Sequence, residues 1–182
     1  ATYCLDRINE GHKALCIHNP ATGREATIPH VISRSTGPRR RIAVVGAGPA
    51  GLEAARVSAE RGHEVILFEA ASQAGGQVRL ATQLPRRREL IGIVDWRVAQ
   101  CERLGVDMRY NTIAEASDIL ALEADVVFIA TGGLPRNEAI EQGAELAVSS
   151  WDVLSGDVKP AEDVLLFDDN GAHPGMSAAE RI

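Results

Sequence analysis

Short apolar runs alternate with helix-forming segments along most of this chain. The runs at 41–45, 65–68, 106–110 and 125–130 have the length and aliphatic content of strands buried in a parallel sheet. A helix is expected after the first run, from Leu52 onward. A second is expected over 86–104, where apolar residues recur at helical spacing: Leu90, Ile91, Val94, Val98 and Leu104. The pattern therefore predicts an α/β fold around a central parallel sheet.

The two ends of the chain lie outside this alternation. Residues 1–38 hold two of the three cysteines and a loop-like stretch, and 161–182 contain a further apolar run and the start of an amphipathic helix. We expect a strand at 164–167 and a helix from Ser177. The chain begins with alanine and its last helix is short, so we expect a fragment truncated at both ends. The predicted domains are 1–38, 39–160 and 161–182.

A glycine turn joins the first predicted strand to the first predicted helix. It reads Gly46-Ala47-Gly48-Pro49-Ala50-Gly51. In dinucleotide-binding folds the first glycine permits the tight turn, the second lets a pyrophosphate approach the backbone, and the third allows the helix to pack on the sheet. Pro49 suits the first helical turn, where no N–H partner is available. The free N–H groups of that turn attract phosphate.

An acid follows the second strand at the spacing that such sites use. Glu69 comes 18 residues after Gly51 and directly after the run at 65–68. Its carboxylate can accept both hydroxyl groups of an adenosine ribose and would repel a 2′-phosphate. The alternative is a glycine turn that binds nothing. The two strands and the acid together favour a Rossmann-like nucleotide site.

Composition narrows the choice of partners. The formal net charge is −6, which argues against nucleic acid and leaves no basic membrane patch. No apolar stretch reaches membrane-spanning length and no signal peptide opens the chain, so a cytoplasmic location is expected. Only 4% of the residues are aromatic, which suits an aliphatic core.

The cysteines give little information by themselves. Cys4 and Cys16 are separated by eleven residues, with His12 and His18 nearby. Two cysteines make no metal site without further ligands, and a disulfide is not expected in the cytoplasm. Cys101 falls in a predicted helix and is expected to be inert.

With these motifs in place, the chain resembles the multidomain old-yellow-enzyme-like oxidoreductases, which include 2,4-dienoyl-CoA reductase, trimethylamine dehydrogenase and demethylases of N-methylated amino acids. The segment around Cys4 and Cys16 resembles their iron–sulfur region. The glycine turn and the later motifs at 61–63, 75–77 and 130–132 extend the resemblance over essentially the whole chain.

The resemblance implies an architecture and a set of cofactors. The complete enzyme would have an FMN-binding barrel, a 4Fe-4S cluster, an FAD- or ADP-binding domain and a second nucleotide-binding domain. Cys4 and Cys16 would be the third and fourth cluster ligands, in the complete protein only. The adenine nucleotide would be held by twelve residues: Gly46, Gly48, Pro49, Ala50, Gly51, Glu69, Ala70, Gly75, Gly76, Gln77, Thr131 and Gly132.

The chain departs from the family in its second glycine-containing turn, at 168–175. That turn lacks the three-glycine spacing, and Asp168 and Asp169 would repel a pyrophosphate. This turn argues against nicotinamide binding. Several amine-oxidising relatives have a similarly altered second turn and pass electrons to a carrier protein, so the resemblance implies an electron-transfer acceptor as a candidate partner. This favours a demethylase or amine dehydrogenase over an enoyl reductase as the complete enzyme.

Three functions remain open from the sequence. The chain is an FAD-binding redox module, a structural ADP-binding domain of the same enzyme, or a domain of an NAD-dependent dehydrogenase. No residue is placed to act as a catalytic group, so we expect the fragment alone to be inactive.

Overall fold

Four parallel strands form the sheet at the centre of this molecule. The computed structural model describes residues 3–135, 142–168, 171 and 173–182. The strands are β1 (Arg41–Val45), β2 (Glu64–Phe68), β3 (Asp107–Arg109) and β4 (Val126–Ile129), and they lie in the order β3-β2-β1-β4. The predicted α/β fold with a parallel sheet is confirmed.

Strand β1 is paired with a neighbouring strand on each side. Val44 lies opposite Leu67 of β2 on one side and Phe128 of β4 on the other. The chain moves from β1 to β2 to β3 in one direction, whereas β4 returns to the far side of β1. The strand order therefore reverses between β1 and β4, and open α/β sheets bind ligands at such a point, beyond the carboxyl ends of the strands.

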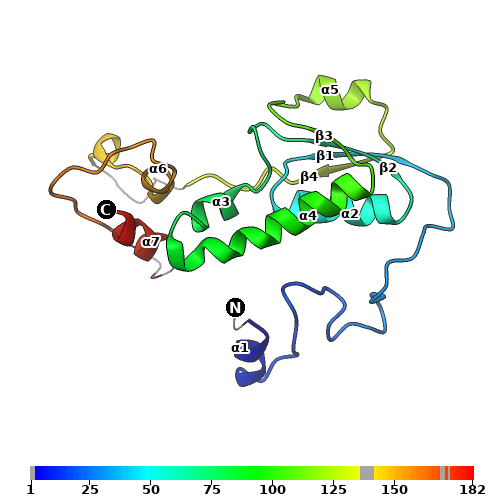
Figure 1. The fold of residues 1–182 in the computed structure, drawn as a ribbon, viewed down its shortest axis with the longest axis horizontal. Coiled ribbons are helices and arrows are strands. Elements are labelled where there is room, and N and C mark those ends of the chain that lie inside the picture. Colours follow the sequence, from blue (N-terminus) through cyan, green and yellow to red (C-terminus); the bar gives the residue numbers. More distant parts are fainter. Residues whose placement is uncertain (1–2, 136–141, 169–170, 172) are drawn as a thin grey trace.

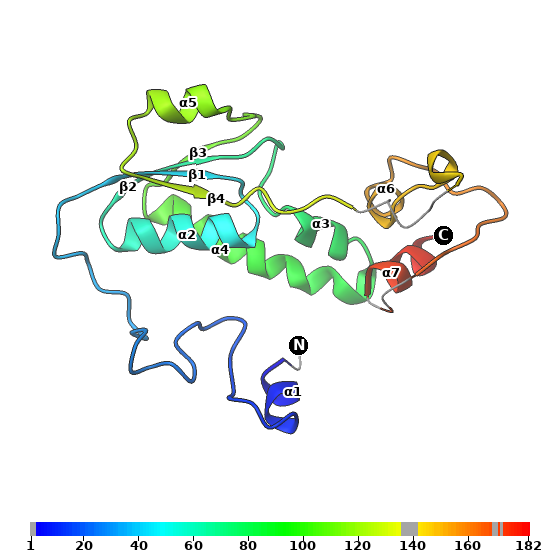
Figure 2. The ribbon, with the colours of Figure 1, turned by 180° about the vertical axis from the view of Figure 1, so that it is seen from behind.

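Helices α2 (Pro49–Glu60) and α4 (Gly92–Arg103) lie together on one face of the sheet, and α5 (Ala116–Ala121) lies on the other side (Figures 1 and 2). The apolar residues that the sequence placed at strand and helix positions meet between the sheet and the two long helices. The largest fully buried side chains belong to this layer: Leu52, Leu67, Val44, Val94 and Cys101.

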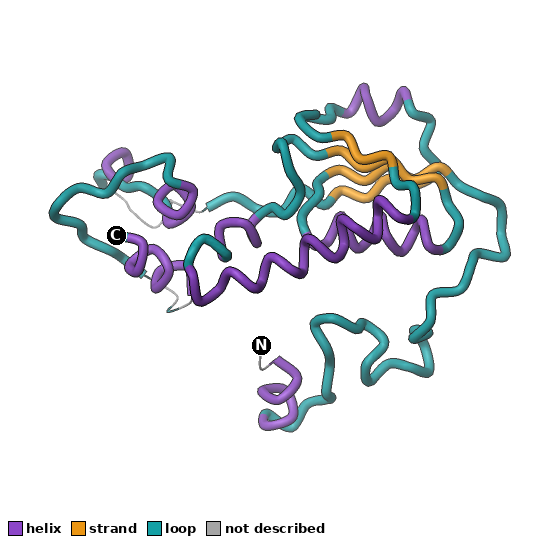
Figure 3. Tube along the Cα trace, in the orientation of Figure 1, coloured by secondary structure: helices purple, strands orange, loops and turns teal. Residues whose placement is uncertain are grey.

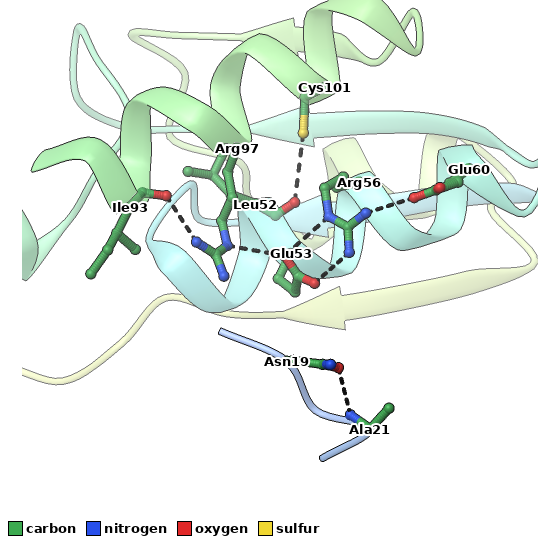
Figure 4. Close-up of polar contacts among 9 residues, drawn as sticks. All are labelled: Asn19, Ala21, Leu52, Glu53, Arg56, Glu60, Ile93, Arg97 and Cys101. Atoms are coloured by element: carbon green, nitrogen blue, oxygen red, sulfur yellow. Dashed lines mark hydrogen bonds and ion pairs between the residues drawn. The ribbon is translucent and has the colours of Figure 1, made fainter. Parts of the chain in front are cut away.

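A charged cluster joins α2 to α4 at the edge of that core (Figure 4). The Arg56 guanidinium donates to both carboxylate oxygens of Glu53, at 2.6 and 3.2 Å, and Arg97 of α4 donates to the same carboxylate at 3.0 Å. Both arginines also lie over the ring of Trp96. Burial opposes ionisation of Glu53, but the hydrogen bonds and charges of the two arginines outweigh it and lower the pKa of that carboxyl.

The helix expected over 86–104 is present, but it begins as a 3₁₀ helix and continues as an α-helix. Its first part is the 3₁₀ helix η1 (Pro85–Ile91), and α4 continues from Gly92. Ile91 and Gly92 both have right-handed helical dihedrals, so the chain runs through the junction without a break. The short helix α3 (Gln77–Ala81) precedes η1.

The strand expected at 164–167 does not form. These residues have no regular secondary structure, and the side chain of Leu165 is 96% exposed. A strand needs a hydrogen-bonded neighbour, and within the described residues this segment pairs with none. The following helix does form, as α7 (His173–Arg181), and packs against α6 (Ser150–Ser155). A one-turn 3₁₀ helix, η2 (Ala144–Leu146), precedes α6.

Residues 3–40 run beside the sheet domain rather than within it (Figure 3). They contain α1 (Tyr3–Asn9), which the sequence analysis did not predict, and then irregular chain up to β1. A hydrogen bond from the Ser35 amide to the Arg61 carbonyl attaches this segment to the end of α2.

Candidate nucleotide-binding site

The glycine turn lies at the carboxyl end of β1, between that strand and α2. Gly46 has a φ of +100° and donates its N–H to the Phe68 carbonyl of β2 at 2.8 Å. A Cβ at Gly46 would fall under 3.0 Å from the Ala130 carbonyl beyond β4. Positive φ and this close approach both favour glycine, so Gly46 lets the chain turn sharply between β2 and β4.

The other two glycines of the turn have different surroundings. A Cβ at Gly51 would fall under 3.0 Å from the Gly46 carbonyl oxygen and 3.3 Å from the Ala130 Cβ, so Gly51 is required for close packing. A Cβ at Gly48 would meet nothing within 4 Å. The protein therefore does not need a glycine at Gly48 for its own packing, and a side chain there would fill open space at the helix start.

The start of α2 leaves its amides available. Pro49 is the first helical residue, Gly48 is the N-cap, and no side chain caps the helix. The helix is twelve residues long, so its dipole places partial positive charge at this end. Ala50 is exposed in the first turn. An anion such as a diphosphate fits this end of the helix.

Glu69 leaves the end of β2 and turns toward the glycine turn. Its carboxylate accepts the Ala47 N–H at 2.7 Å and the Ala71 N–H at 2.9 Å. Ala70, which lies between Glu69 and Ala71 in the sequence, is exposed. The Glu69 side chain is half-buried and lies beside the glycine turn.

Two further loops that the sequence singled out lie against the same turn. The Gly75 amide donates to the Ala47 carbonyl at 2.9 Å, and a Cβ at Gly76 would lie 3.4 Å from the Gly48 Cα. The Gln77 side chain donates to the Gly133 carbonyl at 3.4 Å. The loops after β1, β2 and β4 therefore converge.

The exit from β4 is exposed where it faces Gln77. Thr131 and Gly132 are both exposed, and Gly132 has a φ of +76°. The structure thus brings every predicted nucleotide-binding residue to one edge of the sheet. Alone, none of these contacts requires a ligand; together they gather the predicted residues around the carboxyl ends of β1, β2 and β4.

Two residues of this edge were not assigned a role from the sequence. Ala130 must be small because it packs on Gly46 and Gly51. The sequence feature that could have indicated this is the position of Ala130, at the end of a predicted strand and before Thr131 and Gly132. Arg79 of α3 donates to the Ala74 carbonyl and packs on Gly75. No local sequence pattern indicates that Arg79 stabilises the loop that precedes α3.

Cys4 and Cys16 lie in the segment before β1 rather than in the converging loops. Cys4 is exposed on α1 and Cys16 is half-buried, with its Sγ accepting the His18 N–H at 3.4 Å. Among the described residues, no three His, Cys, Asp or Glu side chains cluster closely enough to hold a metal. Cys101 is buried in the core, its Sγ donates to the Leu52 carbonyl at 3.6 Å, and burial raises the pKa of its thiol to about 11.

The second glycine-containing turn is only partly described, since 169–170 and 172 lie outside the described residues. In the part that the structure describes, Asp168 accepts the Gly171 N–H at 3.1 Å. A Cβ at Gly175 would fall 2.6 Å from the Asp168 carboxylate. The Asp168 carboxylate therefore lies beside the first turn of α7.

The sheet order and the converging loops define a Rossmann-like nucleotide-binding domain. A family model described as pyridine nucleotide-disulphide oxidoreductase matches residues 40–161. The chain belongs to this family.

Relatives and solved structures narrow the family further. A probable N-methylproline demethylase of Rhizobium meliloti (strain 1021) is 62% identical over 99% of this chain and 26% of its own length. The N,N-dimethylglycine/sarcosine dehydrogenase of Chromohalobacter salexigens is 48% identical over 100% of this chain and 27% of its own length. Histamine dehydrogenase from Rhizobium sp. 4-9 matches with a TM-score of 0.80 at 26% identity, over 95% of this chain and 27% of that structure.

These findings confirm the resemblance drawn from the motifs, because the relatives are named demethylases and dehydrogenases. The chain spans about a quarter of the length of the relatives it matches. No helix in the part of the chain that the structure describes is long and apolar enough to cross a membrane.

Proposed function

We propose that this chain binds FAD at the carboxyl ends of β1, β2 and β4, as the flavin-binding module of a larger oxidoreductase. The observation that carries the proposal is the open space at Gly48, at the uncapped start of α2. The diphosphate would lie there, against the backbone of the turn. The adenosine ribose would bind Glu69, which lies beside that turn.

FAD is favoured over ADP by the far half of the site. ADP would engage only the glycine turn and Glu69, whereas the loops at Gly76 and Gly132 extend the site beyond the diphosphate. Gln77 connects these loops through its hydrogen bond to Gly133. The ribitol and the flavin ring of FAD would need this additional surface. Flavin, when bound, supplies one- and two-electron transfer, and the protein positions it.

A visible absorption spectrum separates the two ligands. The full-length polypeptide that contains this chain is stripped of nucleotide and incubated with FAD or ADP. Retention of a flavin absorption band after gel filtration, with release by excess ADP, supports the proposal. Tight ADP binding without flavin retention favours the structural ADP domain instead, and binding of neither rejects a nucleotide site.

We propose further that the whole enzyme oxidises N-methylated amino acids or related amines. The demethylase and dehydrogenase named above, which align with nearly the whole chain, support this. In that enzyme an FMN barrel would carry the substrate chemistry, and Cys4 and Cys16 would ligate a 4Fe-4S cluster with two further cysteines. Electrons would then pass to an acceptor protein. Iron analysis of the full-length Cys4→Ala and Cys16→Ala variants tests the cluster, with Cys101→Ala as the control that keeps its iron.

A further inference from the structure

Glu69 has hydrogen-bonding partners on every polar group, before any nucleotide is considered. Its amide donates to the Arg109 carbonyl and its carbonyl accepts the Thr112 N–H, both at 2.9 Å. Its side chain accepts the N–H groups of Ala47 and Ala71. One residue therefore connects the glycine turn, the loop after β2 and the chain after β3.

We infer that Glu69 is a positioning residue for the glycine turn, in addition to the ribose contact assigned above. It holds the turn in the shape that accepts a diphosphate, so its carboxylate contributes to the affinity for ligands that it does not touch. The inference rests on the proposed nucleotide site.

The surroundings of Ala47 support this role. Ala47 is fully buried, so its N–H is shielded from bulk water and needs a partner within the protein. Glu69 supplies that partner from 22 residues away, with a short charge-assisted bond. On the carbonyl side, the Gly75 amide donates to Ala47. The N–H and the carbonyl of Ala47, the residue before Gly48, are thus both held by residues outside the glycine turn.

The two tasks of Glu69 do not exclude each other. An ionised carboxylate has about four acceptor positions, and the bonds to Ala47 and Ala71 occupy one on each oxygen. One position on each oxygen remains for the two ribose hydroxyls. The positioning role and the ribose contact can therefore be separated by changing the ligand rather than the protein.

The first arm of the test compares ADP with 2′,3′-dideoxy-ADP, which lacks both ribose hydroxyls. Isothermal titration uses nucleotide-free, full-length wild-type and Glu69→Gln protein. A glutamine has one acceptor oxygen and loses the charge, so it cannot satisfy both backbone amides. We expect the dideoxy ligand to bind the variant about tenfold more weakly than wild type, as loss of a charge-assisted hydrogen bond implies. Equal affinities would overturn the inference.

The second arm needs no nucleotide. Amide hydrogen exchange of Ala47 is followed in the ligand-free full-length protein. We expect exchange to be about tenfold faster in Glu69→Gln than in wild type, and unchanged protection would overturn the inference. Glu89→Gln, an exposed glutamate on η1, removes the same charge and should leave both arms unchanged. If Glu69→Gln does not fold, Glu69→Asp replaces it, because its shorter side chain keeps the charge but loses the reach to Ala47.

The two arms also separate this inference from the proposed function. A wild-type protein that binds no adenine nucleotide contradicts the nucleotide site, whereas the exchange measurement still tests whether Glu69 holds the turn. Normal nucleotide binding with no effect of Glu69→Gln on either arm contradicts the positioning role alone.

Discussion

Replacing Gly48 by alanine should weaken nucleotide binding about 100-fold and leave the fold intact. Its φ of −68° and ψ of 176° suit any residue, and a Cβ there meets nothing within 4 Å. The change in unfolding free energy should therefore stay within about 1 kcal/mol, since alanine also reduces the entropy of the unfolded chain. The new methyl group would occupy the space in which the diphosphate approaches the backbone. A displacement that costs about 3 kcal/mol weakens binding about 100-fold.

Two glycine variants make this prediction specific. Gly51→Ala places a Cβ under 3.0 Å from the Gly46 carbonyl oxygen, so the backbone must move and the protein should lose about 3 kcal/mol of stability. Gly92→Ala lies in a helix with nothing within 4 Å of the new Cβ. It should gain about 1 kcal/mol and bind ADP normally.

The assay combines ADP titration calorimetry with urea unfolding followed by circular dichroism. We expect Gly48→Ala to unfold like wild type and to bind ADP about 100-fold more weakly. Wild-type ADP affinity in Gly48→Ala would refute the reasoning. So would a loss of stability as large as that of Gly51→Ala, because the space at Gly48 would then serve packing rather than a ligand.

Three further predictions concern other parts of the molecule. Glu53→Gln should cost about 2 kcal/mol in urea unfolding, because it weakens the ion pair to Arg56 within α2 and the ion pair to Arg97 that connects α2 to α4. The half-exposed pair of Glu64 with Arg41 is the control, and Glu64→Gln should cost under about 0.5 kcal/mol. The pKa of Glu53 in the folded protein lies below its usual 4.5, so ionised Glu53 adds to the stability of the fold above pH 4.5, and this stabilisation is lost as the pH falls through the lowered pKa. Equal pH dependence of stability in wild type and Glu53→Gln would contradict this. Cys101 should resist iodoacetamide at pH 8 in the folded protein and react once the protein is unfolded in urea, and rapid labelling of Cys101 in the folded protein would show that its thiol is not buried. Gln77→Ala should weaken FAD retention about threefold through loss of its bond to Gly133, with ADP affinity unchanged, and an equal effect on both ligands would place Gln77 outside the flavin half.

The two central strands could be predicted from their apolar runs because β1 and β2 are buried on both faces, whereas β4, predicted as a buried run, is mostly exposed. β1 matches its predicted range, and β2 begins one residue earlier than expected. The run at 164–167 has the same apolar character, yet it forms no strand. Composition reports that a segment can be a strand, whereas pairing decides whether it is one, and the pairing partner cannot be read from local sequence.

The site shows the same division between local and long-range information. The glycine turn, the acid after β2 and the two later loops could be found because each has its own sequence pattern. The bonds between them could not, because Ala47 and Glu69 meet across 22 residues and Gln77 meets Gly133 across 56. The small size required at Ala130 likewise depends on a contact with a distant turn.

The most direct test of the central claim is amide chemical-shift mapping of the labelled full-length protein during ADP titration. We predict saturable shifts at Gly46–Gly51 and at Glu69–Ala71, with additional shifts at Gly132 and Gly133 when FAD replaces ADP. An absence of saturable shifts, or shifts confined to residues away from the carboxyl ends of β1, β2 and β4, would contradict the account.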